Sequence, residues 1–88
     1  MIEKVAYSRN FKKSVKKLPK RIQALSEKKI QLFLTNPFHV SLKTHPLHGI
    51  QKGVWAFSIN FDYRVVFEFY NPKSVIFYEI GTHQIYKK

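Results

Sequence analysis

The chain has 88 residues and a mass of 10.5 kDa, and 44% of its residues are hydrophobic and 16% aromatic. One small domain with a real core fits this length, and two do not. Sixteen Lys and Arg against five Asp and Glu give a formal net charge of +11, which excludes a DNA mimic and favours a polyanionic partner. The aromatic content also excludes a disordered basic tail.

The chain has no cysteine, which excludes a disulfide framework, a thiolate zinc site and a cysteine nucleophile. Its first residues lack the apolar stretch of a signal peptide. No segment approaches the roughly twenty apolar residues that cross a bilayer. We therefore expect a cytoplasmic protein without a membrane partner.

The first half of the sequence predicts one strand and two helices. Residues 2 to 7 favour a β-strand, and Ser8 is typical of a helix N-cap. An apolar stripe at helical spacing continues to the residue before Pro19, which suits the start of a second helix. Asn36 and Pro37 end that helix, so the sequence predicts a helical hairpin.

The second half predicts an antiparallel meander. Residues 38 to 53 have neither helical nor strand periodicity and indicate a loop. Strands are expected over residues 54 to 60, 63 to 70 and 75 to 80. The chain is therefore expected to be a single α+β domain, residues 1 to 88, with helices packed on one face of the sheet.

Alternation assigns each strand residue to one of two faces. The face expected against the helices carries Trp55, Phe57, Ile59, Val65, Phe67, Phe69, Ile76, Tyr78 and Ile80. The partly open face carries Ser58, Asn60, Arg64, Glu68 and Glu79.

Most of the basic residues lie in the predicted helices, with few acidic residues to balance them. Such a pattern is ordinarily a solvated helix face, and the excess positive charge favours binding to RNA phosphates instead. The residues concerned are Lys12, Lys13, Lys16, Lys17, Lys20 and Arg21.

Polar groups gather around the open face, at Lys52, Asp62, Arg64, His83 and Tyr86. Metal-free RNA cleavage needs such a set: a base for the ribose 2′-hydroxyl, fixed cations for the phosphorane, and an acid for the leaving oxygen. The tyrosine adds a plane on which a base can stack. The same residues also fit a purely structural pattern, in which the histidine lies on the surface and the arginine forms an ion pair with an acid on the same face.

Three histidines, His39, His45 and His48, fall in the loop. Their spacing of six and three residues invites a metal interpretation. No carboxylate or cysteine lies among them, so we predict no metal site and no cofactor.

Several segments resemble a known family. They are His45-Pro46-Leu47-His48-Gly49, Lys52-Gly53-Val54-Trp55, Asp62-Tyr63-Arg64-Val65-Val66-Phe67 and Ile80-Gly81-Thr82-His83-Gln84-Ile85-Tyr86. Over nearly the whole chain, the sequence resembles the RelE/ParE toxin superfamily of bacterial type II toxin–antitoxin systems, and is most similar to its RelE and YafQ branch.

This resemblance implies roles for particular residues. His45, Asp62 and His83 fall on acid/base positions, Arg64 on the phosphate-binding arginine, Lys52 in a basic loop and Tyr86 near a C-terminal aromatic. Ser58 stands where YafQ-like proteins carry a further histidine.

The resemblance also implies a function, namely ribosome-dependent cleavage of mRNA by 2′-hydroxyl attack to give a 2′,3′-cyclic phosphate. The expected partners are the ribosome, its mRNA and rRNA, and an acidic antitoxin that forms a heteromeric complex with the toxin. Two alternatives are a ParE-like inhibitor that binds DNA gyrase and a basic RNA-binding domain without toxicity.

Overall fold

The computed structural model describes residues 1–49 and 52–87, and for residues 86 and 87 it describes the backbone alone. The described chain contains, in order, β1 (Lys4–Tyr7), α1 (Arg9–Lys16), α2 (Lys20–Thr35), the 3-10 helix η1 (Val40–Leu42), β2 (His45–Pro46), β3 (Val54–Ser58), β4 (Arg64–Asn71), β5 (Ser74–Gly81) and the 3-10 helix η2 (His83–Lys87).

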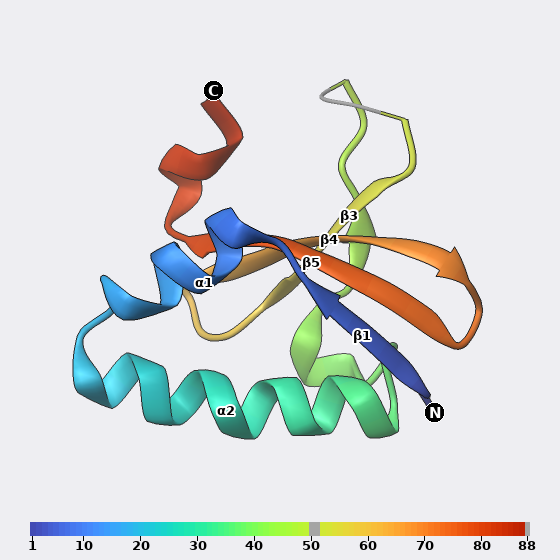
Figure 1. Ribbon diagram of the computed structural model, residues 1–88, viewed down its shortest axis with the longest axis horizontal. Helices are drawn as coiled ribbons and strands as arrows, with labels where there is room; N and C mark the ends of the chain where they lie inside the picture. Colours follow the sequence, from blue (N-terminus) through green and yellow to red (C-terminus); the bar gives the residue numbers. More distant parts are fainter. Residues whose placement is uncertain (50–51, 88) are drawn as a thin grey trace.

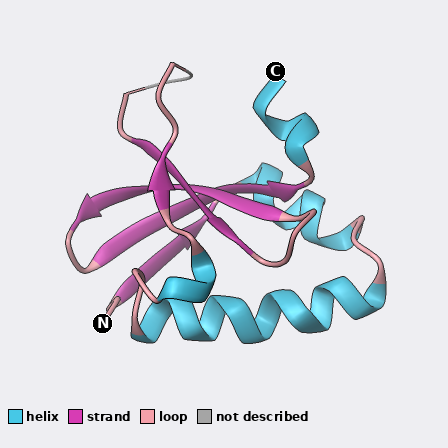
Figure 2. Cartoon of the chain, turned by 180° about the vertical axis from the view of Figure 1, so that it is seen from behind, coloured by secondary structure: helices cyan, strands magenta, loops and turns pink. Residues whose placement is uncertain are grey.

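The strands form one five-stranded sheet in the order β1-β5-β4-β3-β2. Strands β2 to β5 pair antiparallel as a meander. The first strand, β1, lies at the other edge and pairs parallel with β5. Helix α2 runs along one side of the sheet, whereas η2 and the loop before β3 rise on the other side (Figures 1 and 2). The expected α+β architecture is confirmed.

Helix α1 starts at the predicted N-cap and lies along β5. The Ser8 hydroxyl accepts a hydrogen bond from the Phe11 N–H (2.9 Å) and donates one to the Tyr78 carbonyl (2.7 Å). The Ser14 hydroxyl accepts from the Ile80 N–H (3.1 Å). Helix α1 thus satisfies backbone groups of β5 where β1 ends. The two helices follow each other through the short connection at residues 17–19, as the predicted hairpin requires, with α1 packed against β5 and α2 spanning the sheet.

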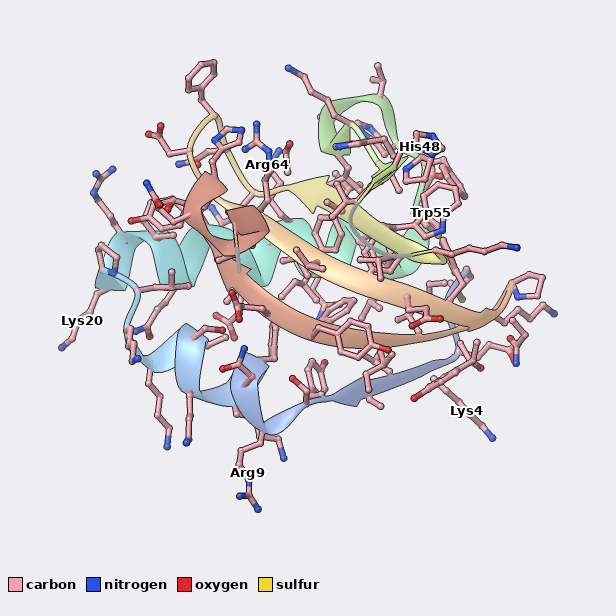
Figure 3. All side chains as sticks on the ribbon, turned by 90° about the horizontal axis from the view of Figure 1, so that it is seen from above. Lys4, Arg9, Lys20, His48, Trp55 and Arg64 are labelled. Atoms are coloured by element: carbon pink, nitrogen blue, oxygen red, sulfur yellow. The ribbon has the colours of Figure 1, made fainter. Side chains whose placement is uncertain are left out.

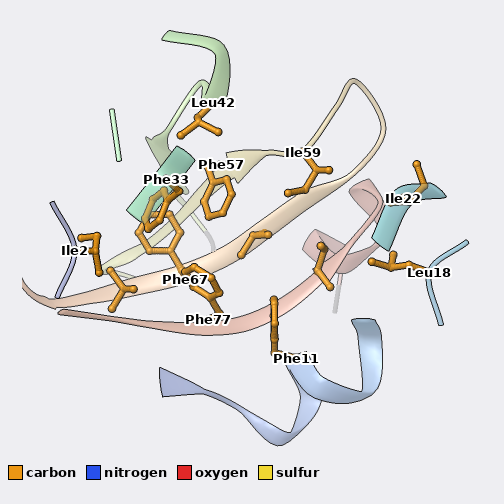
Figure 4. Close-up of a cluster of buried hydrophobic side chains, with 13 residues drawn as sticks. Ile2, Phe11, Leu18, Ile22, Phe33, Leu42, Phe57, Ile59, Phe67 and Phe77 are labelled. Atoms are coloured by element: carbon orange, nitrogen blue, oxygen red, sulfur yellow. The ribbon is translucent and has the colours of Figure 1, made fainter. Parts of the chain in front are cut away.

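The core lies between α2 and the sheet (Figure 4). The ring of Phe33 on α2 stacks on Phe57 at 4.3 Å between centroids, and meets Phe67 and Phe77 edge-on at 4.9 and 5.7 Å. All four rings are fully buried. Burial of large aromatic rings in such contacts stabilises the fold.

The predicted face assignment is wrong for the first part of β5. Val75 and Phe77 are buried in the core, whereas Ile76 and Tyr78 are only partly buried. The ladder passes from the pair Phe67 and Phe77 to the pair Val66 and Glu79, so β5 carries an extra residue there. This β-bulge reverses the alternation, and Ile80 therefore returns to the core.

The segment from 38 to 53 is not loop throughout. It forms η1, and β2 pairs with β3 at the edge of the sheet. Leu47 then packs with Val54, Ala56 and Val66 in a small apolar cluster on the face away from α2. Both elements are too short for a periodic pattern to predict them. Within the described residues no helix is long and apolar enough to span a bilayer.

Candidate functional site

Three adjacent strands meet at one end of the sheet, which we call the site end. In the ladder Ser58 on β3 lies opposite Arg64 on β4, which lies opposite Gly81 on β5. Asp62 precedes the arginine by two residues and His83 follows the glycine by two. The register therefore brings these predicted site residues to a single edge, although they come from separate segments.

The turn between β3 and β4 is held by its own hydrogen bonds. The Asn60 side-chain oxygen accepts from the backbone N–H groups of Asp62 (2.9 Å) and Tyr63 (2.8 Å), and the Ile59 N–H donates to the Tyr63 carbonyl (2.8 Å). This is the local bonding typical of an Asn turn. It fixes the backbone from which the exposed Asp62 carboxylate projects.

Arg64 is anchored to the same turn. Its Nη1 donates to the Phe61 carbonyl oxygen at 3.0 Å, and the side chain is only partly buried. This bond uses one of the five guanidinium donors and fixes the direction of the group. A guanidinium held in this way is suited to a phosphate, because its remaining donors keep their planar fork geometry.

The ion pair considered from the sequence does not form within the described residues. Their one ion pair joins Lys73 to Glu3, at 3.7 Å on the surface. Glu68 instead accepts a hydrogen bond from the Tyr78 hydroxyl (2.6 Å), which raises the pKa of Tyr78 from 10.0 to about 12. The buried Glu79 accepts from the side-chain amide of Asn10. Arg64 is therefore not neutralised by either acid.

His83 is the first residue of η2, which folds back over the end of β5. An added Cβ at Gly81 would lie 2.7 Å from the Ile85 Cγ2 atom, so the close approach of η2 to the strand requires glycine there. The side chain of His83 is exposed at the site end. Tyr86 also falls in η2, and its side chain lies outside the described residues.

His45 reaches the sheet through β2. It pairs with Ala56, two residues before Ser58 on β3. The His45 Nδ1 lies 2.7 Å from the Lys43 carbonyl oxygen. Because a carbonyl can only accept, Nδ1 carries the proton, and Nε2 of the neutral ring is left as an acceptor.

The other loop histidines have different roles. The Nδ1 of His39 accepts from the Ser41 N–H at 3.1 Å and caps η1, and the His48 side chain is exposed. Among the residues that the structure describes, no three His, Asp or Glu side chains gather as a metal site requires.

Lys52 lies away from the site end. It precedes Val54, which is separated from Ser58 by the length of β3, roughly 13 Å at the usual rise per residue. Its loop, which includes His48, lines a hollow of about 430 Å³. In Figure 3 Arg64 and His48 lie toward the same side of the molecule.

The basic residues predicted to bind RNA lie on the two helices or directly beside them. Lys12, Lys13, Lys16 and Lys17 are on α1 or directly after it, and Lys20 and Arg21 begin α2. Figure 3 shows Arg9, at the start of α1, on the side of the molecule opposite to Arg64, and Lys20 at one end. Lys13 and Lys17, however, line a hollow together with Tyr63, Gly81 and Thr82, so part of the basic helical surface adjoins the site end.

The structure has two surface features that the sequence analysis does not predict. One is a hollow of about 350 Å³ between α1, β5 and η2, where Lys13 and Lys17 lie near the Glu79–Asn10 pair. The other is Phe61, an exposed ring beside Arg64. The Asn-Phe-Asp order of the turn was the available signal for the second, since an apolar residue between two turn-forming polar residues has no core to join.

Comparisons with known proteins bear on the fold of the chain. No protein-family model matches the sequence, and the search of curated proteins finds no match. Among solved structures, YafQ from E. coli strain BL21(DE3) is similar with a TM-score of 0.77 and 25% identity over 97% of both chains. The E. coli DinJ–YafQ toxin–antitoxin complex matches with a TM-score of 0.72 and 28% identity over 92% of both chains.

A more distant structure shares the fold. The archaeal RelE–RelB complex from Pyrococcus horikoshii OT3 matches with a TM-score of 0.72 and 16% identity, over 93% of this chain and 96% of that one. This match shows the fold alone, whereas the YafQ structures also support a toxin of the type II toxin–antitoxin class. The chain therefore has the fold of the RelE-superfamily toxins, and within that superfamily it resembles YafQ.

Proposed function

We propose that the protein is an endoribonuclease toxin that cleaves mRNA on the ribosome and is neutralised by an antitoxin. The observation that carries this proposal is Arg64, fixed by the Phe61 carbonyl at the site end with Asp62 and His83 in the neighbouring segments. The similarity to YafQ over nearly the whole chain supports the same assignment.

The proposed reaction needs only side-chain chemistry. A base removes the proton from the ribose 2′-hydroxyl, O2′ attacks the adjacent phosphorus, and the bond to O5′ breaks as an acid protonates that oxygen. The products are a 2′,3′-cyclic phosphate and a 5′-hydroxyl. Arg64 stabilises the charge on the phosphorane, a contribution worth about 10²- to 10³-fold in rate for one such donor.

Three groups are proposed for the proton transfers. Neutral His45, with Nδ1–H bonded to the Lys43 carbonyl, presents Nε2 as an acceptor and suits the base. His83 at the site end is then the proposed acid, and Asp62 is the carboxylate at the same end of the sheet. Ser58 is opposite Arg64 in the ladder and cannot replace a histidine as a proton donor near neutral pH.

The ribosome would supply what so small a site lacks. If the ribosome holds the mRNA with the 2′-hydroxyl in line with the leaving oxygen, this orientation is worth about 7 to 11 kcal/mol of the barrier. The basic helical surface, which includes Lys13 and Lys17 at the edge of the site end, would bind ribosomal RNA phosphates. Such binding weakens steeply with salt.

An acidic antitoxin is the proposed protein partner. A net charge of +11 favours fast capture by a negatively charged segment and makes the association rate sensitive to salt. An association rate that is equal at low and high salt would contradict this proposal.

A reconstituted translation reaction tests the function. Purified protein should cut mRNA in the presence of translating ribosomes, leave cyclic-phosphate ends, and cut naked mRNA far more slowly. Loss of growth with intact mRNA and broken chromosomal DNA would instead support the ParE-like gyrase inhibitor, and unchanged growth with retained RNA binding would support a simple RNA-binding domain.

A further inference from the structure

The most exposed large apolar side chain in the described part of the chain is Phe61, at 86% of its full accessible area. It stands in the turn between β3 and β4, beside the proposed catalytic residues. An aromatic ring left in water gains nothing from folding, so core packing does not account for its position. A single exposed apolar residue is common, and the surroundings of this ring distinguish it.

The turn that carries Phe61 is rigid. Asn60 accepts hydrogen bonds from the next two backbone N–H groups after Phe61, and Ile59 donates to the Tyr63 carbonyl at 2.8 Å. Tyr63 packs against the core and anchors the turn from within. The ring is therefore displayed from a fixed backbone, which lowers the entropy lost when a ligand binds it.

The same turn holds a fixed cation. The guanidinium of Arg64 donates to the Phe61 carbonyl oxygen at 3.0 Å, so the cation and the ring project from one short stretch of backbone. No carboxylate pairs with this guanidinium within the described residues. A cation and a flat apolar ring carried by the same turn match a nucleotide, which combines a phosphate with a flat base.

We propose that Phe61 is a stacking platform for one unpaired base of single-stranded RNA next to the phosphate bound by Arg64. This inference rests on the proposed ribonuclease function and adds a base-binding residue to it. Recognition through the ring face tolerates any base and adds affinity rather than a hydrogen-bonded code. Phe61 thereby positions the strand, while proton transfer stays with the histidines.

Binding to uncleavable RNA tests the platform. The probes are a single-stranded 2′-O-methyl oligonucleotide of mixed sequence and an abasic oligonucleotide of the same length, both at one fixed salt concentration. Phe61→Ala should weaken binding of the first probe by roughly 5- to 150-fold, the range that stacking of one base gives, and leave binding of the second unchanged. Tyr70→Ala, which removes a 64% exposed ring at the far end of β4, should change neither.

Two further variants separate stacking from simple apolar contact. Phe61→Leu should behave as Phe61→Ala does, and Phe61→Trp should bind as the wild type and lose tryptophan fluorescence when the first probe is added. The denaturation midpoint should be the same in all variants. Equal weakening of both probes by Phe61→Ala, wild-type affinity in Phe61→Leu, or an unquenched Phe61→Trp would overturn the platform.

The cleavage assay distinguishes failure of this inference from failure of the proposed function. If Phe61→Ala cuts and binds as the wild type while Arg64→Ala does not cut, the platform is wrong and the ribonuclease stands. If the wild-type protein cuts no mRNA and Phe61→Ala still loses base-dependent affinity, the ring binds bases and the ribonuclease is wrong.

Discussion

The two faces of the sheet have opposite chemistry although the same strands build both. On the α2 side, Phe57, Phe67 and Phe77 surround Phe33 in a fully buried aromatic cluster. On the other side, the polar residues Ser58, Arg64 and Glu68 lie beside a small apolar cluster built around Val54 and Ala56. Stability is concentrated on one face and the proposed chemistry on the other, so substitutions should separate the two properties.

The largest expected effect is on the aromatic face. Phe33→Ala should lower the free energy of unfolding by about 3 to 5 kcal/mol, because it removes a ring that contacts three others and leaves a cavity. Chemical denaturation measures this loss. If the variant does not fold, Phe33→Leu, which keeps most of the volume, should cost less than about 1.5 kcal/mol. Tyr70→Ala is the control, and an equal cost there would contradict a core centred on Phe33.

The opposite face should respond in activity instead. Arg64→Ala should reduce ribosome-dependent cleavage by about 10²- to 10³-fold, and Arg64→Lys should restore little of it because the fork geometry is lost. The free energy of unfolding should change by only about 0.5 kcal/mol, since the side chain is near the surface. Arg9→Ala removes the same charge on the opposite side of the molecule and should leave the single-turnover cleavage rate unchanged. An equal loss of single-turnover cleavage in both variants would mean that charge alone matters.

A smaller effect is expected where α1 joins β5. Ser8→Ala removes the cap hydrogen bond from the Phe11 N–H and the bond to the Tyr78 carbonyl, and should cost about 1 to 2 kcal/mol. Thermal and chemical denaturation give the value. Ser41→Ala, which removes only an exposed contact with His39 in η1, is the control and should cost far less. A neutral Ser8→Ala would show that α1 contributes little to holding β5.

The smallest effect concerns the pH dependence of stability. The bond from Tyr78 to Glu68 raises the pKa of Tyr78 in the fold to about 12, above its ordinary value of 10.0. A raised pKa favours the neutral phenol in the folded state. Its contribution to stability is complete below pH 10 and is lost as the pH rises from 10 to 12. Tyr78→Phe should therefore show a shallower fall in stability over that interval, and an unchanged slope would exclude the coupling to Glu68.

The sequence predicted the helix boundaries and most strand faces, but not the β-bulge or the two-residue strand. Ser8 and Pro19 marked the helix boundaries correctly because capping chemistry is local. The faces of β3 and β4 followed from alternation, whereas β5 did not, because the bulge near Tyr78 depends on pairing with a strand elsewhere in the chain. The two-residue strand β2 is stabilised only by its partner and has no pattern of its own.

The candidate site was predictable in part for the same reason. The gathering of Asp62, Arg64 and His83 at one edge follows from the meander. The separation of Lys52 by the length of β3, and the proton position on His45, depend on tertiary placement that no spacing encodes.

The most direct test of the proposed nuclease is a map of mRNA 5′ ends after pulsed expression in cells. The wild type is compared with an Arg64→Ala, His83→Ala double variant of equal stability. The wild type should give cuts in translated reading frames, and the double variant should give none and resume growth. Cuts that persist in the double variant, or growth arrest without any cuts, would contradict a ribosome-dependent nuclease with its site at this end of the sheet.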